Sequence, residues 1–368
     1  MIVYCYFFLS SKLTYIFLFC FCIFFYERHT WFDRDLGLSG RVLIRNDDGK
    51  IEQKLIKIDK PILQIPNLAI HLQTAAEREA FKYNKEDHLV PILSLEVKKA
   101  LGGSTGSNND NKEETIEDGW VEYQESLLLQ LISKELSIPI SSIVDFELNL
   151  FDIQKASLGG VYSEFIHSAR LDNLASCFMA VQSLVEYVTD NDGSALDNDE
   201  DISMIALFDH EEVGSSSATG AGSPIMGQAV KRISHALSSD RDNFTEEYER
   251  VIGKSFVLSV DQAHAIHANY ASKHEKHHAP RMNCGMVIKR NSNQRYATTG
   301  ITGFIVREIA RKAGLQPVQE FVVRNDCGCG STIGPIISTN TGIRAIDLGC
   351  PQLAMHSIRE TMGTSDGK

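Results

Sequence analysis

Residues 202–217 have the sequence ISMIALFDHEEVGSSS, and this stretch decides which fold the chain is expected to adopt. The apolar run 202–208 predicts a strand buried on both faces, as strands of parallel sheets are. The run is followed at once by Asp209, His210, Glu211 and Glu212, ahead of a turn at Gly214. Because open α/β sheets bind ligands at the carboxyl ends of their strands, this position favours a ligand site.

The adjacent carboxylates of Glu211 and Glu212 repel each other, which leaves two interpretations of this stretch. In the first, it is a solvated acidic turn, which is the commoner origin of an isolated Glu-Glu pair. In the second, a divalent cation offsets the repulsion, with one carboxylate binding the ion and the other acting as a base. The rest of the chain has to decide between them.

Composition indicates a globular protein and excludes some classes of partner. The 368 residues can bury one large core or two moderate ones, and the net charge of −12 is spread along the chain. No basic stripe is present, so we expect no nucleic acid partner. The eight cysteines are too few and too scattered for a disulfide framework, so we expect reduced thiols and a cytoplasmic location.

Residues 1–28 differ from everything that follows, because the first 26 consist mainly of Phe, Tyr, Cys, Ile and Leu. Lys12 divides them into runs that are each short for a membrane span. A signal peptide would need a basic start and a small-residue cleavage site, and neither is present. Our interpretations are, in order, a wrongly assigned gene start, a membrane anchor and a signal peptide, so a membrane is not an expected partner.

The segment 29–162 is predicted to form a β-rich domain, with alternating apolar positions and turn residues. The expected elements are a hairpin of Arg41–Arg45 and Ile51–Ile58, short β-branched segments over 62–72 and 88–97, a polar loop over 101–119, a helix over 120–135 and a strand over 143–151.

The segment 163–368 alternates helices and strands, which is the rhythm of a doubly wound sheet. Besides the strand 202–208 and an acidic linker over 190–201, the expected elements are helices over 171–188, 227–239, 246–251 and 300–313, and strands over 255–260, 319–324 and 343–348.

Acidic and histidine residues fall at the ends of these elements. Asp172 starts a helix, Asp261 ends a strand, and His356 follows the strand 343–348. Each has an ordinary explanation: a helix cap, a turn residue and a packed histidine. Together with Glu211 and Glu212 they form an oxygen-rich set with one histidine, which suits zinc, manganese or cobalt.

At these residues the chain resembles the M18 aspartyl aminopeptidases, a family of dinuclear zinc metallopeptidases. The matching blocks are RLDNLASC, DHEEVGS, SVDQAHAIHANY, VIKRNSNQRYA, CGSTIGPI and DLGCPQLAMHSIRE, and, in the β-rich segment, TWFDRDL, PILQIPNLAIHL, HLVPIL and LGGVYSEFI. The resemblance implies an α/β/α metallopeptidase domain with a mixed, mostly parallel sheet over 163–368. It also implies that 29–162 is an inserted dimerisation domain.

The resemblance also implies the chemistry of the site. Two Zn²⁺ ions per subunit would be bound, with Asp172 bridging them. The other ligands of one ion would be Glu212 and His356, and Asp261 would bind the second ion. Glu211 would be the general base that takes a proton from a metal-activated water and passes it to the leaving amine.

The implied substrates are peptides with an N-terminal Asp or Glu. By resemblance, His264 contacts the substrate, and Lys289 and Tyr296 form the pocket for its acidic side chain, where a lysine is a sensible counter-charge. His71 resembles a histidine that the insertion domain delivers into the active site of a neighbouring subunit; from pattern alone it is a core histidine in a strand. The family forms dimer-based dodecamers, so we expect a homo-oligomer.

Two departures from the family qualify this interpretation. The His-x-Asp motif that supplies a ligand of the second ion does not occur, and no closing helix follows the last residues. The alternative is therefore a truncated homologue, catalytically impaired or inactive, with only an oligomerisation or metal-binding role. The histidine-rich run 274–278 is interpreted as a surface loop, and Cys327 and Cys329 as structural.

Overall fold

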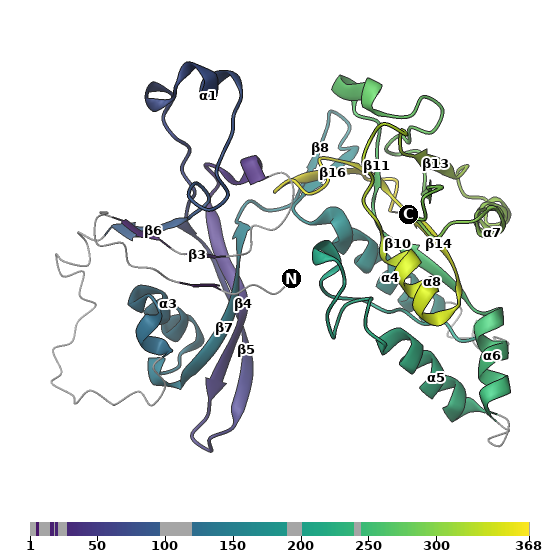
Figure 1. Cartoon of the computed structure of the whole chain (residues 1–368), viewed down its shortest axis with the longest axis horizontal. Coiled ribbons are helices and arrows are strands. Elements are labelled where there is room, and N and C mark those ends of the chain that lie inside the picture. The colour runs from purple at the N-terminus through teal and green to yellow at the C-terminus, as the bar shows by residue number, and fades with distance from the viewer. Residues whose placement is uncertain are drawn as a thin grey trace. The chain divides into compact units, whose positions relative to one another are not determined.

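The computed structural model describes residues 5–6, 15–17, 19–20, 28–95, 120–189, 201–238 and 244–367. The chain divides into two compact units, Met1–Lys155 and Ala156–Lys368, drawn in Figure 1. The sequence predicted the boundary at 162/163. The predictions of a polar loop over 101–119 and, except for its last residue, of a linker over 190–201 lie outside the described residues.

The first unit is built on an antiparallel sheet of three long strands, in the order β5 (Ile51–Leu63), β4 (Leu36–Arg45) and β7 (Ile143–Asp152). The predicted hairpin is confirmed, and its turn is closed by the amide of Asn46, which donates to the Lys50 carbonyl over 2.9 Å. Helix α3 (Ser126–Leu136) packs on this sheet and buries Leu128, Leu129 and Ile132. The helix begins later than predicted, after the 3₁₀ turn η3 (Val121–Tyr123).

The remaining elements of this unit are short. They are β1 (Cys5–Tyr6) paired with β3 (Phe19–Cys20), β2 (Tyr15–Phe17) paired with β6 (Ile92–Leu95), helix α1 (Ala75–Glu79), and the 3₁₀ turns η1 (Arg28–Trp31), η2 (Ile70–Leu72) and η4 (Ile140–Ser142). Most of the hydrophobic segment 1–28 lies outside the described residues. Among the described residues, no helix is long and apolar enough to cross a membrane.

The second unit contains a four-stranded sheet in the order β10 (Phe256–Val260), β14 (Arg344–Gly349), β12 (Val287–Arg290) and β13 (Gln319–Val322). Strand β10 is parallel to β14, and β12 is parallel to β13, whereas β12 and β14 are antiparallel. The predicted mixed α/β class is thereby confirmed, and so are the predicted strands 255–260, 319–324 and 343–348, within one or two residues at their ends.

A second, mainly antiparallel sheet continues this unit. Its strands run in the order β11 (Ala263–His264), β15 (Pro351–Leu353), β16 (Glu360–Gly363), β9 (Phe165–Ser168) and β8 (Ser157–Gly159). The chain passes from β14 of the first sheet directly into β15 of the second. Since β10 likewise leads into β11, the junction between the two sheets places Asp261 next to β14.

The helices of the second unit are α4 (Leu171–Thr189), α5 (Ile225–Leu237), α6 (Phe244–Lys254), α7 (Gly300–Lys312) and α8 (Ile333–Thr341). Four of them were predicted. Val306 of α7 packs with Ile288, Ile346 and Leu348 of the four-stranded sheet. Helix α8 contacts β10 and β14 (Figure 1).

The predicted strand 202–208 is wrong. In the described part of the chain this run pairs with no neighbouring strand, and Ile202 and Leu207 are 58% and 57% exposed. A strand buried on both faces needs a paired edge and a covering layer on each side. The apolar run specifies a tendency to be buried, but no described neighbour of this unit satisfies it.

Candidate metal centre

Asp172 enters the site from the first turn of α4. Its backbone angles, φ −83° and ψ 108°, are not helical, so the residue lies at the start of the helix and outside its regular helical turns. Its side chain is 5% exposed. The prediction that Asp172 begins a helix is confirmed, and the irregular backbone turns its carboxylate away from the helix.

Glu211 and Glu212 lie on the 3₁₀ turn η6 (Glu211–Val213), between two left-handed residues, His210 (φ 60°) and Gly214 (φ 100°). The loop around them is closed by hydrogen bonds: the amide of Ser215 donates to the His210 carbonyl over 2.8 Å, and the His210 ring lies 2.7 Å from the Ser217 hydroxyl. These bonds hold the turn without using either carboxylate, which leaves both carboxylates available to the site.

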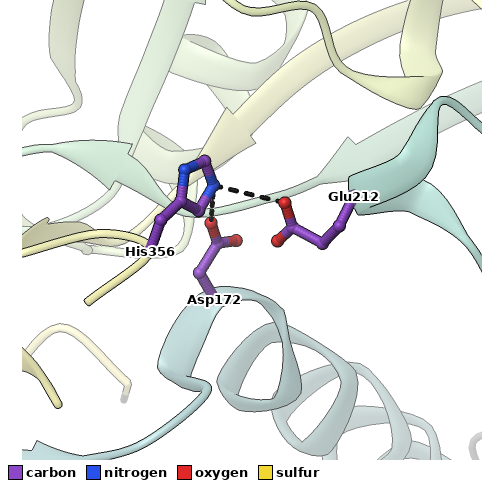
Figure 2. A group of neighbouring side chains, drawn as sticks. All are labelled: Asp172, Glu212 and His356. Carbon is purple, nitrogen blue, oxygen red and sulfur yellow. Dashed lines mark ion pairs between the residues drawn. The ribbon is translucent and has the colours of Figure 1, made fainter. Parts of the chain in front are cut away.

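His356 occupies the loop between β15 and β16, also with a left-handed backbone (φ 66°). Its Nε2 lies 3.3 Å from Oδ2 of Asp172 and 3.3 Å from Oε2 of Glu212, as Figure 2 shows. We call Asp172, Glu212 and His356 the triad. One ligand atom from each lies within 4.8 Å of the others.

The triad fits a zinc ion. Tetrahedral zinc with ligands at about 2.0–2.1 Å holds neighbouring donor atoms about 3.3 Å apart. Both separations from His356 equal that spacing. Carboxylate oxygen and imidazole nitrogen are both zinc ligands, and catalytic zinc sites use three protein ligands and leave a fourth position open.

The triad and its surroundings carry more acidic groups than basic ones, which affects the pKa values of its members. Burial, reinforced by the neighbouring carboxylates, raises the pKa of Asp172 to about 6 and that of Glu212 to about 7. The hydrogen bond to Asp172 raises the pKa of His356 to about 9. Without an ion, the protonated imidazole balances the carboxylates, so a metal has to displace protons in order to bind.

Glu211 lies beside the triad. Its pKa is raised to about 8, mainly by burial and further by the negative charges of Asp261, Glu212 and Asp172. A carboxylate with a pKa near neutrality is suited to accept and return a proton.

Asp261 is brought to the triad from the end of β10, and its carboxyl shares a hydrogen bond with Asp172. The backbone of Asp261 lies against Gly349, where any Cβ would meet the Asp261 carbonyl at 1.8 Å, so only glycine fits there. Lys289 of β12 donates to Oδ2 of Asp261 over 2.9 Å. Burial opposes ionisation of Asp261, but this ammonium keeps its pKa below the usual range.

The other predicted pocket residues lie close to Lys289. Its Nζ is 5.6 Å from the centre of the buried Tyr296 ring, and the Cys329 thiol donates to the Tyr296 hydroxyl over 3.3 Å. The ring of His264, on β11, lies edge-on to Phe321 at 5.5 Å. The predicted structural role of Cys329 therefore has a contact that explains it, whereas Cys327 is exposed.

His71 belongs to the first unit. It lies on the 3₁₀ turn η2 and is exposed, as are its neighbours Ile70 and Leu72. The interpretation of His71 as a core histidine in a strand is therefore wrong, because β5 ends at Leu63 and the following segment does not return to the sheet.

Sequence reasoning did not single out Glu360, Asn173 or Gln262, although each contacts the backbone beside a predicted ligand. Glu360 accepts hydrogen bonds from the amides of Asp172 and His356. Asn173 and Gln262 each come one position after a predicted ligand, and Glu360 comes four positions after His356. Only the folded chain shows their contacts. The histidine-rich run 274–278 forms no metal-binding group among the described residues.

Comparison with known proteins identifies the family. Residues 25–368 match the family described as Aminopeptidase I zinc metalloprotease (M18). The chain belongs to this family. It is 47% identical over 354 residues to a probable aspartyl aminopeptidase of Ricinus communis, covering 92% of this chain and 70% of that protein. It is also 47% identical over 355 residues to an aspartyl aminopeptidase of Aspergillus oryzae, with the same coverage.

Solved structures agree with the family assignment. A chain of the cryo-EM structure of the Ape4 and Nbr1 complex matches at 41% identity and a TM-score of 0.86, over 97% of this chain and 65% of that one. The crystal structure of prApe1 matches at 29% identity and a TM-score of 0.85, over 98% and 72%. The M18 chain described here thus spans roughly two thirds of the length of the relatives it matches.

Proposed function

We propose that this protein is a zinc aminopeptidase that removes N-terminal Asp or Glu from peptides. The observation that carries the proposal is the triad with Glu211 beside it: three donor atoms within 4.8 Å of one another, two of whose separations are the 3.3 Å of tetrahedral zinc, and a carboxyl group whose pKa is raised to about 8. The names of the homologues supply the substrate class.

The triad would hold one Zn²⁺, and Asp261 beside Asp172 would contribute to a second. Bound zinc acts as a Lewis acid toward a peptide carbonyl and makes a water molecule easier to deprotonate. Glu211 would accept the proton of the attacking water and return it to the departing amine, a role best served by a pKa near the working pH.

Specificity for an acidic side chain would come from Lys289. Lys289 is 3% exposed and its ammonium pairs with Asp261 at the edge of the site, so little water screens its charge. Its Nζ lies over the buried Tyr296 ring, and the His264 ring contacts Phe321, which in turn contacts Tyr296. A substrate carboxylate placed here gains an attraction that a neutral side chain lacks.

The exposed His71 and its apolar neighbours support a homo-oligomer in which the first unit reaches a partner's active site. A related protein, S. cerevisiae mApe1, is a dodecamer. For this chain we propose an oligomer built from dimers, in which His71 of one subunit acts in the active site of the partner.

The test is activity of the purified chain reconstituted with zinc. We expect release of aspartate from an Asp-initiated peptide, little release from an Ala-initiated one, and loss of at least about 10²-fold in kcat for Glu211→Gln with zinc content unchanged. The alternative of an inactive homologue has no support in the comparisons. Absence of turnover in zinc-loaded wild-type protein would nevertheless establish it, and turnover by Glu211→Gln would reject Glu211 as the base.

A further inference from the structure

Glu360 is a buried acid that the proposed chemistry does not use. It begins β16 and is 2% exposed. Its Oε2 accepts a hydrogen bond from the backbone amide of Asp172 over 2.9 Å, and its Oε1 accepts one from the backbone amide of His356 over 2.8 Å. One carboxyl group therefore joins the backbones of two triad members.

Burying a carboxyl group is unfavourable unless hydrogen bonds compensate for the lost water. Glu360 receives that compensation from two amides that belong to different segments, since Asp172 is 188 positions away in sequence and His356 only four. The two oxygens of a carboxyl group have a fixed separation. Their bonds consequently fix the spacing between the start of α4 and the loop before β16.

Both amides belong to residues whose backbones need support. Asp172, at the start of α4, has non-helical backbone angles, and His356 has a left-handed φ of 66°. Neither conformation is maintained by the regular hydrogen bonds of a helix or strand. The amide-to-Glu360 bonds take that place, and they are made on the same residues whose side chains meet 3.3 Å apart.

We propose that Glu360 is a positioning residue for the triad, holding the backbones of Asp172 and His356 at the separation that zinc binding requires. The inference rests on the proposed metal-binding function of the triad. Glu360 itself contributes no ligand atom to it: the carboxyl group acts through the backbone, as groups that orient metal ligands from behind commonly do.

The test is zinc affinity of the full chain, measured by competition with a chromophoric chelator, together with the visible absorption spectrum of the Co²⁺ form. Glu360→Gln keeps one acceptor oxygen but turns an NH₂ group toward the second backbone amide. We expect zinc affinity to fall about 10–100-fold and the Co²⁺ spectrum to change, because ligand geometry is altered.

Thr361→Val is the matched control. Thr361 is the next residue of β16, and its hydroxyl lies 2.8 Å from Nδ1 of His167 rather than near the triad. This variant loses a hydrogen bond in the same strand, so it reports the purely structural cost. We expect its melting temperature to fall while its zinc affinity and Co²⁺ spectrum stay those of the wild type.

The outcomes separate the two proposals. If wild-type protein binds zinc and Glu360→Gln binds it equally well, the positioning role is overturned and the triad is unaffected. If wild-type protein binds no zinc, or Glu212→Gln binds as much as wild type, the triad itself fails. Should Glu360→Gln not fold, Glu360→Asp, which keeps both oxygens on a shorter arm, decides by the same measurement; if that variant is also unfolded, Glu360 serves the fold and the positioning role is rejected.

Discussion

The side-chain amide of Asn173 donates a hydrogen bond to the backbone carbonyl of Val260 over 2.8 Å. A reciprocal bond runs beside it, from the amide of Gln262 to the carbonyl of Leu171 over 3.3 Å. Asn173 follows Asp172 and binds Val260, which precedes Asp261. Gln262 follows Asp261 and binds Leu171, which precedes Asp172. This pair of bonds ties the start of α4 to the end of β10 and fixes how closely the two carboxyl groups approach.

Asn173→Ala should destabilise the protein by about 1–2 kcal/mol, because it leaves the Val260 carbonyl without its donor in a partly buried setting. It should also lower zinc stoichiometry or affinity, since the Asp172–Asp261 separation is no longer restrained. Thermal unfolding and metal titration check both effects. Gln182→Ala, which removes an exposed bond to Glu186 in the same helix, is the control and should change neither.

The metal-free protein should lose stability as the pH rises. The pKa values of Asp172, Glu212 and Glu211 are raised, chiefly by burial, to about 6, 7 and 8, so the folded state holds protons that the unfolded state has released. Stability then falls with pH wherever the folded state binds more protons.

The raised pKa of His356, about 9, acts in the same direction, because its stabilising charge is present at low pH and is lost as the pH rises through that value. We expect the free energy of unfolding to drop by on the order of 2 kcal/mol between pH 5 and 8, after allowing for partial exposure. Melting scans without metal check this, and zinc should reverse the trend. A metal-free stability that rises over this range would contradict the protonated triad.

The cysteines should differ in reactivity. Burial raises the pKa of the Cys350 thiol to about 12, and this thiol donates to the Asp366 carbonyl, whereas Cys284 and Cys327 are exposed. Since the thiolate is the nucleophile, a thiol reagent in native buffer should modify the two exposed cysteines quickly and Cys350 only after unfolding. Mass spectrometry of the labelled peptides measures this directly; early labelling of Cys350 would show that its packing is open.

Lys289→Met should remove the preference for acidic substrates. The substitution keeps an unbranched side chain of similar length but removes the charge that faces Asp261 and lies over the Tyr296 ring. The ratio of kcat/KM for Asp- over Ala-initiated peptides should fall about tenfold or more. Lys231→Met, at an exposed lysine above Tyr248, is the matched control and should leave the ratio unchanged. If the ratio survives in Lys289→Met, another group recognises the acidic side chain.

The local pattern of the sequence predicted the hairpin of β4 and β5, because strict alternation and a turn at 46–49 specify both the strands and their register. It failed at 202–208, where burial depends on neighbours that no local pattern contains. At the site, Asp172, Glu212 and His356 were found because ligand residues have recognisable types at the ends of elements. Glu360 was not, because its contact with the backbone of Asp172 depends on the pairing of β16 with β9, the strand before α4, and the residue type alone does not indicate that pairing.

His71 and Glu211 should complement each other between subunits. If the first unit of one subunit completes the partner's site, His71→Ala and Glu211→Gln are each nearly inactive alone. In a two-fold dimer that carries one variant of each kind, one site combines an intact Glu211 with an intact His71, and the other site lacks both. Co-refolding equal amounts should therefore restore about a quarter of wild-type activity, since half of the dimers are mixed and each has one complete site. Each variant refolded alone is the control. No recovery in the mixture, with mixed dimers demonstrated by differential tags, would show that His71 acts within its own subunit or not at all.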